Sequence, residues 1–205
     1  MVEPVSTPEA RSEADAAVST RRPMAPYIAL AVALVVGALF VLLAGSKTRV
    51  NREDASSPLI NRPAPDVVGP TLDGGEFSLS RRKGSWVVLN FFQTTCVPCV
   101  QEHPELVAFA EQQASIAEGA ELVSVIWNDS FGPVREFFAA NGGGTWPVVA
   151  SDGAAVDYGV PKVPETWIID PNGVVVVHII TTVTADGLAT LIDQLKTAEA
   201  QTAGG

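Results

Sequence analysis

The stretch WVVLNFFQTTCVPC, residues 86–99, decides the fold, because it joins an apolar, β-prone run to a closely spaced pair of cysteines at the start of a helix-like segment. Cys96 and Cys99 are the two cysteines of the chain. Thiols separated by two residues can close a small disulfide ring and open it again. The sequence therefore carries one dithiol that can cycle between an oxidised and a reduced form.

The position of the pair at a helix N-terminus distinguishes the two thiols. Free backbone N–H groups and the positive end of the helix dipole stabilise a thiolate at Cys96, so we expect Cys96 to be the nucleophile. Cys99 lies one turn further along the helix, and we expect it to be the resolving thiol that attacks a mixed disulfide at Cys96. Pro98 suits the first helical turn, where the N–H that it lacks would have no partner.

Other uses of a Cys-X-X-Cys pair fit the sequence less well. A structural disulfide across two residues would remove little entropy from the unfolded chain. Haem attachment would need a histidine at position 100, which is occupied by Val. A zinc site would need further ligands, and only His103 and His178 remain as imidazoles. We expect neither a metal nor a cofactor.

An apolar segment near the N-terminus predicts membrane attachment. Tyr27 to Ala44 carries no charge, and its 18 residues are just enough to cross a bilayer as a helix. We therefore expect an uncleaved transmembrane anchor over residues 27–45, with a cleaved signal peptide as the alternative. A buried core helix is disfavoured because the stretch has no polar face. Positive charges are balanced on its two sides and do not fix its orientation.

The remaining chain divides around this anchor. Composition predicts a disordered cytoplasmic tail over residues 1–26, a polar tether over 46–62, one folded domain over 63–198 and a flexible C-terminus over 199–205. A dithiol with no other cysteine to protect fits an extracytoplasmic compartment, although cytosolic redox proteins also carry this motif. We expect a single-pass protein of the cell membrane, with its domain on the extracytoplasmic side.

The charge balance limits the partners. The net charge of −10 makes nucleic acid and anionic lipid surfaces poor partners. It permits a basic protein partner, and it equally fits a solvated acidic surface that keeps the protein soluble.

Alternating elements predict an α/β domain. The first half alternates strand and helix, over residues 86–92, 98–115, 121–127 and 133–141, which indicates a sheet with helices on both faces. In the second half, strands at 166–170 and 174–180 are joined by a turn too short for anything but an antiparallel hairpin. An amphipathic helix over 185–198 follows, and a mixed sheet results.

Two motifs in this order give the chain a family resemblance. It resembles the membrane-anchored, thioredoxin-like thiol-disulfide oxidoreductases of the TlpA, ResA and CcmG (DsbE) type. The likeness covers roughly residues 63–195. It rests on CVPC after the strand VVLNFF, and on YGV at 158–160 followed by VPETWIID at 163–170. The resemblance implies a thioredoxin-like fold, with a mixed central sheet flanked by helices and an N-terminal transmembrane helix.

The resemblance also implies roles for residues outside the cysteine pair. Pro164 matches the family's cis-proline, which packs opposite the cysteines and shapes a groove for a substrate strand, with Val163 and Glu165 bordering it. Glu102 matches an acidic residue near the resolving cysteine, where a carboxylate can accept the thiol proton. The alternative for Glu102 is an exposed glutamate on the helix surface.

The chain departs from the family at one position of the site. Relatives usually carry Trp directly before the first cysteine, and here Thr95 stands there, which leaves the shielding of that cysteine open. His103 and Trp127 match no family role, and we expect them on the surface and in the core respectively.

In this family the domain receives electrons from a membrane thiol donor and reduces client protein disulfides, often the haem-attachment cysteines of apocytochrome c. The resemblance thus implies dithiol exchange through CVPC. Peroxiredoxins share the fold, but their pattern needs a proline ahead of the nucleophile that residues 91–95 lack. A non-catalytic, tethered binding module is the third hypothesis, and it would keep its activity without either cysteine.

Overall fold

The chain forms two units, residues 1–49 and 50–205. The computed structural model describes residues 34–35 of the first and 57–203 of the second. The predicted tail, nearly all of the predicted anchor at 27–45 and the tether up to residue 56 lie outside the described residues. Within the described ranges, no helix is both long enough and apolar enough to cross a bilayer.

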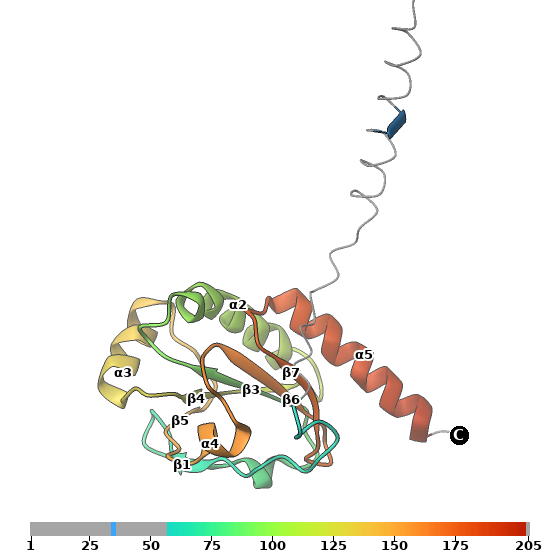
Figure 1. Ribbon diagram of the computed structural model, residues 1–205, viewed down its shortest axis with the longest axis horizontal. Helices are drawn as coiled ribbons and strands as arrows, with labels where there is room; N and C mark the ends of the chain where they lie inside the picture. The colour runs from blue at the N-terminus through green and yellow to red at the C-terminus, as the bar shows by residue number, and fades with distance from the viewer. Residues whose placement is uncertain (1–33, 36–56, 204–205) are drawn as a thin grey trace, which may run out of the picture. The chain divides into compact units, whose positions relative to one another are not determined.

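A five-stranded mixed sheet forms the centre of the domain (Figure 1). Its order is β5 (Val148–Val149), β4 (Glu121–Ile126), β3 (Val87–Phe92), β6 (Glu165–Ile169) and β7 (Val175–Ile179). The strands β3, β4 and β5 run parallel, whereas β6 pairs antiparallel with both β3 and β7. The predicted mixed sheet and its hairpin are therefore confirmed.

The central strand β3 is buried along its whole length, as its apolar sequence predicts. Because side chains alternate along a strand, Val88 and Phe92 contribute to one apolar cluster, and Leu89 and Phe91 contribute to the other. Asn90 shares the face of Val88 and Phe92. This strand leads directly into the loop that carries the first cysteine.

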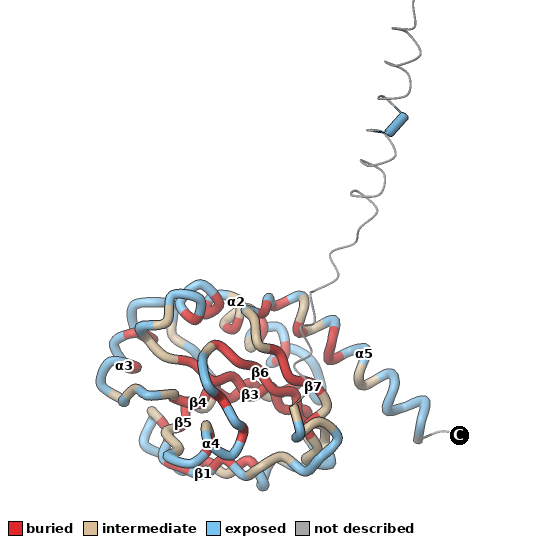
Figure 2. Tube along the Cα trace, viewed as in Figure 1, coloured by how far each residue is buried: buried red, intermediate tan, exposed pale blue. Residues whose placement is uncertain are grey.

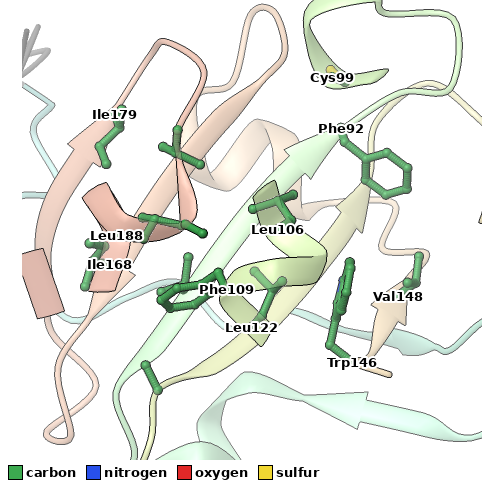
Figure 3. Packing of buried hydrophobic residues seen from close by; sticks show 14 of the residues in the cluster. Phe92, Cys99, Leu106, Phe109, Leu122, Trp146, Val148, Ile168, Ile179 and Leu188 are labelled. Atoms are coloured by element: carbon green, nitrogen blue, oxygen red, sulfur yellow. The ribbon is translucent and has the colours of Figure 1, made fainter. Parts of the chain in front are cut away.

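Three helices cover the face of Val88: α2 (Val97–Ala114), α3 (Phe131–Ala140) and α5 (Ala185–Ala203). The crossovers from β3 to β4 and from β4 to β5 each move one strand further toward the same edge of the sheet. Right-handed crossovers therefore place α2 and α3 on the same face. Figure 3 shows this cluster, in which Phe109 and Leu106 of α2 and Leu188 of α5 pack over the sheet, with Cys99 at its edge.

The opposite face is covered by shorter elements. They are the hairpin of β1 (Val68–Pro70) and β2 (Glu76–Ser78), the 3-10 helix η1 (Leu79–Arg82) and α4 (Ala154–Tyr158). Helices thus lie on both faces, as predicted. The sequence pattern did not indicate β1, β5 and α4, because elements of two to five residues are too short to show a period.

The folded region is longer than predicted at both ends. Leu59 and Ile60, assigned to the tether, pack against the second apolar cluster, and the N–H of Asn61 donates to the carbonyl of Val175 over 2.8 Å. At the other end, α5 continues to Ala203, past the predicted limit of 198. Figure 2 shows that the sheet is buried and that the last turns of α5 are exposed. The last turns therefore extend the helix but do not pack against the core.

Candidate active site

The cysteine pair lies where β3 passes into α2. Cys96 is the N-cap residue of α2, and it forms a disulfide with Cys99 in the first turn, with their Cα atoms 5.2 Å apart. Cys96 is half-buried, whereas Cys99 is only 4% exposed and belongs to the apolar cluster under α2. An external thiol or disulfide can therefore reach Cys96 and is kept from Cys99.

The helix N-terminus surrounds Cys96 with positive polarity. The backbone N–H of Cys99 donates to Cys96 Sγ over 3.2 Å, in the manner of an N-cap hydrogen bond. The helix dipole adds its positive end at the same place. Both effects favour a thiolate at Cys96 over the neutral thiol once the disulfide is reduced.

The loop before β6 lies opposite Cys96. The Val163–Pro164 peptide bond is cis, as the resemblance implied, and the Val163 carbonyl oxygen lies 3.5 Å from Cys96 Sγ. Pro164 is buried and Val163 is half-buried. On the helix side, Val97 is 66% exposed and Val100 is 37% exposed. An apolar rim thus borders the accessible sulfur.

Hydrogen bonds to the carboxylate of Asp129 hold the loop before Cys96. The backbone N–H and the Oγ1 hydroxyl of Thr94 donate to Asp129 Oδ2 over 2.9 and 2.6 Å. Partial burial raises the pKa of Asp129, but the hydrogen bonds from Thr94 and from the Ser130 backbone outweigh it, so the pKa lies below its ordinary value. Thr95 is exposed and does not cover Cys96 as a larger side chain could.

Glu102 is buried on α2, one helical turn after Cys99. Its exposed fraction is 2%, so the alternative of a surface glutamate is wrong. It lies three residues after Cys99, on the same face of α2, and Oε1 accepts the Val183 N–H over 3.1 Å. Burial raises its pKa to about 8, although the Val183 hydrogen bond and the nearby side chain of Asn90 act in the opposite direction. A carboxyl group with this pKa can exchange a proton near neutral pH.

Glu165 occupies a different environment from the one that we expected. Its side chain is 2% exposed, and Oε2 lies 2.7 Å from His178 Nε2 on β7. The His178 ring stacks on Trp167 with the ring centroids 3.5 Å apart, and Trp167 belongs to the cluster on the face away from α2. The carboxylate therefore does not border an exposed groove, because the register of β6 turns it into the interior.

The expectations for His103, on the surface, and for Trp127, in the core, had different outcomes. His103 is buried, contrary to the expectation of a surface residue, because it packs edge-on against Phe137 and Phe138. Its Nε2 lies 3.0 Å from the Gly143 carbonyl oxygen, and burial lowers its pKa. Trp127 is half-buried against the second cluster. The part of the chain that the structure describes contains no group of three or more His, Cys, Asp or Glu residues able to hold a metal.

Sequence reasoning missed two polar residues near Glu102. Asn90 and Thr166 are fully buried, and Asn90 Nδ2 donates to Thr166 Oγ1 over 3.1 Å. One signal was present in the sequence: an asparagine in the middle of an otherwise apolar buried strand. A buried amide needs partners, so it points to a polar cluster in the core.

Comparisons with known proteins agree with this geometry. Residues 60–178 match the AhpC/TSA family. The chain is 34% identical over 138 residues to the thiol-disulfide oxidoreductase ResA of Geobacillus thermodenitrificans, covering 65% of this chain and 76% of that protein. It is 27% identical over 158 residues to the thiol:disulfide interchange protein DsbE of Allochromatium vinosum, covering 75% and 78%. A thioredoxin-family thiol:disulfide interchange protein of Chlorobium tepidum superposes with a TM-score of 0.59 at 26% identity, covering 64% of this chain and 94% of that one.

Proposed function

The chain belongs to the AhpC/TSA family and is a thiol-disulfide oxidoreductase of the ResA and DsbE type, and we propose that it reduces client protein disulfides as a membrane-tethered, extracytoplasmic enzyme. The observation that carries the proposal is the asymmetric pair: a half-buried Cys96 at a helix N-terminus is joined to a buried Cys99, and a buried carboxyl group follows one helical turn later.

The proposed reaction begins with the reduced enzyme. The Cys96 thiolate attacks one sulfur of a client disulfide, forms a mixed disulfide and releases the other client sulfur as a thiolate. An extended client segment lies between the Val163–Pro164 loop and the apolar rim of Val97 and Val100. The half-buried position of Cys96 supports this step, because the residue is partly exposed beside the Val163 carbonyl group.

The second step resolves the mixed disulfide. Ionised Glu102 accepts the proton of the Cys99 thiol, and the resulting thiolate attacks Cys96 Sγ. This attack closes the Cys96–Cys99 disulfide and releases the second client thiolate. A membrane thiol donor then returns two electrons to the pair and restores the dithiol. The pKa of about 8 for Glu102 supports its role, because a carboxyl group of this kind can accept and release the proton near neutral pH.

The membrane attachment rests on the sequence. The apolar segment 27–45 is long enough to act as an anchor, and it would place the domain beside a membrane-bound electron donor. Clients with paired cysteines, such as apocytochrome c before haem attachment, fit this arrangement. A protease-protection experiment on membrane vesicles tests it: the domain should be accessible from the extracytoplasmic side alone, and accessibility from the cytoplasmic side would refute the orientation.

Equilibration with glutathione tests the direction of electron flow. A reductase should have a reduction potential well below that of the glutathione couple, so its disulfide should persist in an excess of reduced glutathione. A potential near that of a strong disulfide oxidant would overturn the reductase assignment.

A peroxidase is the second candidate, because the matched family model is named for AhpC/TSA. Residues 91–95 lack the proline that the peroxidase pattern places ahead of the nucleophile. Peroxide consumption at a rate comparable to disulfide exchange, abolished by Cys96→Ser, would favour the peroxidase instead.

A further inference from the structure

A buried polar cluster lies on the α2 face of the sheet. Asn90 of β3 and Thr166 of β6 face each other in register, and the side chain of Asn90 lies close enough to the carboxyl group of Glu102 to lower its pKa. All three residues are at most 2% exposed. Most polar groups at this depth have a hydrogen-bond partner, so the hydrogen bonds that the cluster can form constrain its protonation.

Two acceptor atoms of the cluster stand without partners. Asn90 Nδ2 donates to Thr166 Oγ1, which turns Asn90 Oδ1 away from that hydroxyl. Among the described residues, neither Asn90 Oδ1 nor Glu102 Oε2 has a hydrogen-bond partner. Leaving both unpaired would be costly. One proton on Oε2, donated to Oδ1, would satisfy both atoms at once.

The ionised form of Glu102 can be satisfied by the same amide. Rotation about χ2 of Asn90 exchanges Oδ1 and Nδ2 at nearly the same positions, and Nδ2 then donates to the carboxylate. The Thr166 hydroxyl can donate as well as accept, so in that arrangement it donates to Asn90 Oδ1. Each protonation state of Glu102 thus has a fully hydrogen-bonded arrangement.

We propose that Asn90 is a positioning residue that hydrogen-bonds Glu102 in both of its protonation states, so that the carboxyl group can take up and release a proton without leaving a buried group unpaired. The inference rests on the proposed role of Glu102 as acceptor of the Cys99 proton. Asn90 acts through Glu102 and exchanges no proton itself.

The other titratable groups on the elements around Glu102 are engaged elsewhere, and Cys99 lies one helical turn before it on the same face of α2. The neighbouring His103 packs against Phe137, and its Nε2 lies 3.0 Å from the Gly143 carbonyl oxygen. On α2, Glu105 accepts the Ala185 N–H, and on α5, Asp186 accepts from Gln112 Nε2, so both carboxylates are engaged elsewhere. On the face of the sheet toward α2, β3 presents Val88, Asn90 and Phe92, and β6 presents Thr166 and Ile168, none of which titrates. The segment before α5 contributes the Val183 N–H.

The test is a titration of Glu102 in the oxidised full chain in detergent, followed by 13C NMR of the carboxyl carbons of labelled glutamate. In Asn90→Leu the donor to the ionised form is lost while burial remains. The Glu102 midpoint should therefore rise by about one pH unit or more. Asn90→Val is the second variant, in case the leucine variant folds poorly, because valine is β-branched and suited to a strand. It should also raise the Glu102 midpoint.

Ser124→Ala is the matched control. Ser124 pairs with Asn90 in register on the neighbouring strand and is buried, but its hydroxyl accepts from Trp146 Nε1. Its loss should leave the Glu102 midpoint unchanged. An unchanged midpoint in both Asn90 variants, or an equal rise in Ser124→Ala, would overturn the proposal.

The same variants separate this inference from the proposed function. In the reduced protein, the pH at which the resolving step reaches half its maximal rate should rise in Asn90→Leu together with the NMR midpoint. If Glu102→Gln leaves the pH profile of that step unchanged, the proposed proton transfer fails, whereas the NMR midpoint still decides the role of Asn90.

Discussion

Replacing Glu102 with Gln should change how the stability of the oxidised domain depends on pH. The pKa of Glu102 is raised from 4.5 to about 8 because the side chain is buried. Between these two values, the folded protein holds a proton that the unfolded chain has released. The free energy of unfolding of the wild type should therefore fall as pH rises across this interval.

The slope is set by one proton. One proton bound in the folded state alone corresponds to about 1.4 kcal/mol per pH unit, so the loss between pH 4.5 and pH 8 is on the order of 4–5 kcal/mol. Gln resembles the protonated acid and does not titrate. We expect Glu102→Gln to be close to the wild type in stability at pH 5 and several kcal/mol more stable at pH 8.

Urea unfolding at pH 5, 6, 7 and 8 measures this difference, with tryptophan fluorescence as the signal, since Trp167 is fully buried. Glu111→Gln, on the exposed side of the same helix, is the control for removing one carboxylate. A stability difference between Glu102→Gln and the wild type that stays constant with pH would refute the reasoning, because it would mean that Glu102 is ionised in the folded domain.

Three further predictions follow from buried or hydrogen-bonded groups. Burial lowers the pKa of His103, so the contribution of His103 to the unfolding free energy should fall as pH drops below about 6.5. This contribution is opposite in sign to that of Glu102, and urea titrations of His103→Leu should lack it. Phe109→Ala removes a fully buried ring under α2 and should lower the free energy of unfolding by about 3–5 kcal/mol, as measured by urea unfolding at pH 5. A loss below about 1 kcal/mol would contradict the packing in Figure 3. Asp129→Asn weakens the hydrogen bonds to Thr94 and should change the rate at which iodoacetamide alkylates reduced Cys96, with little effect on global stability; an unaltered alkylation rate would show that this loop does not shape the site.

The sequence predicted the parts of the fold that have strong local signals. Three elements appear as expected: the apolar strand β3, the helix after the cysteines and the tight turn before β7. Each has a local signal, because the periodicity of apolar residues and the residue types of a turn can be read from a short stretch of sequence. The short elements β5 and α4 depend on packing against distant segments. No local pattern indicates them.

The site divides in the same way. Cys96 and Cys99 could be placed from motif spacing and Pro164 from the family resemblance. The structure joins the two cysteines and brings the carbonyl oxygen of Val163, the residue before Pro164, to 3.5 Å from Cys96 Sγ. The burial of Glu102 and the inward turn of Glu165 could not be predicted, because they depend on which helix or strand face meets the core. His103 was misplaced for the same reason: the aromatic residues that surround it come from α3, far along the chain.

Trapping of a mixed disulfide tests the central claim, that Cys96 attacks and Cys99 resolves. Reduced Cys99→Ala, mixed with a peptide that contains a disulfide, should accumulate a covalent adduct that mass spectrometry maps to Cys96. Reduced Cys96→Ala should accumulate little adduct, because Cys99 is buried. Equal trapping in both variants, or an adduct at Cys99 alone, would contradict the account.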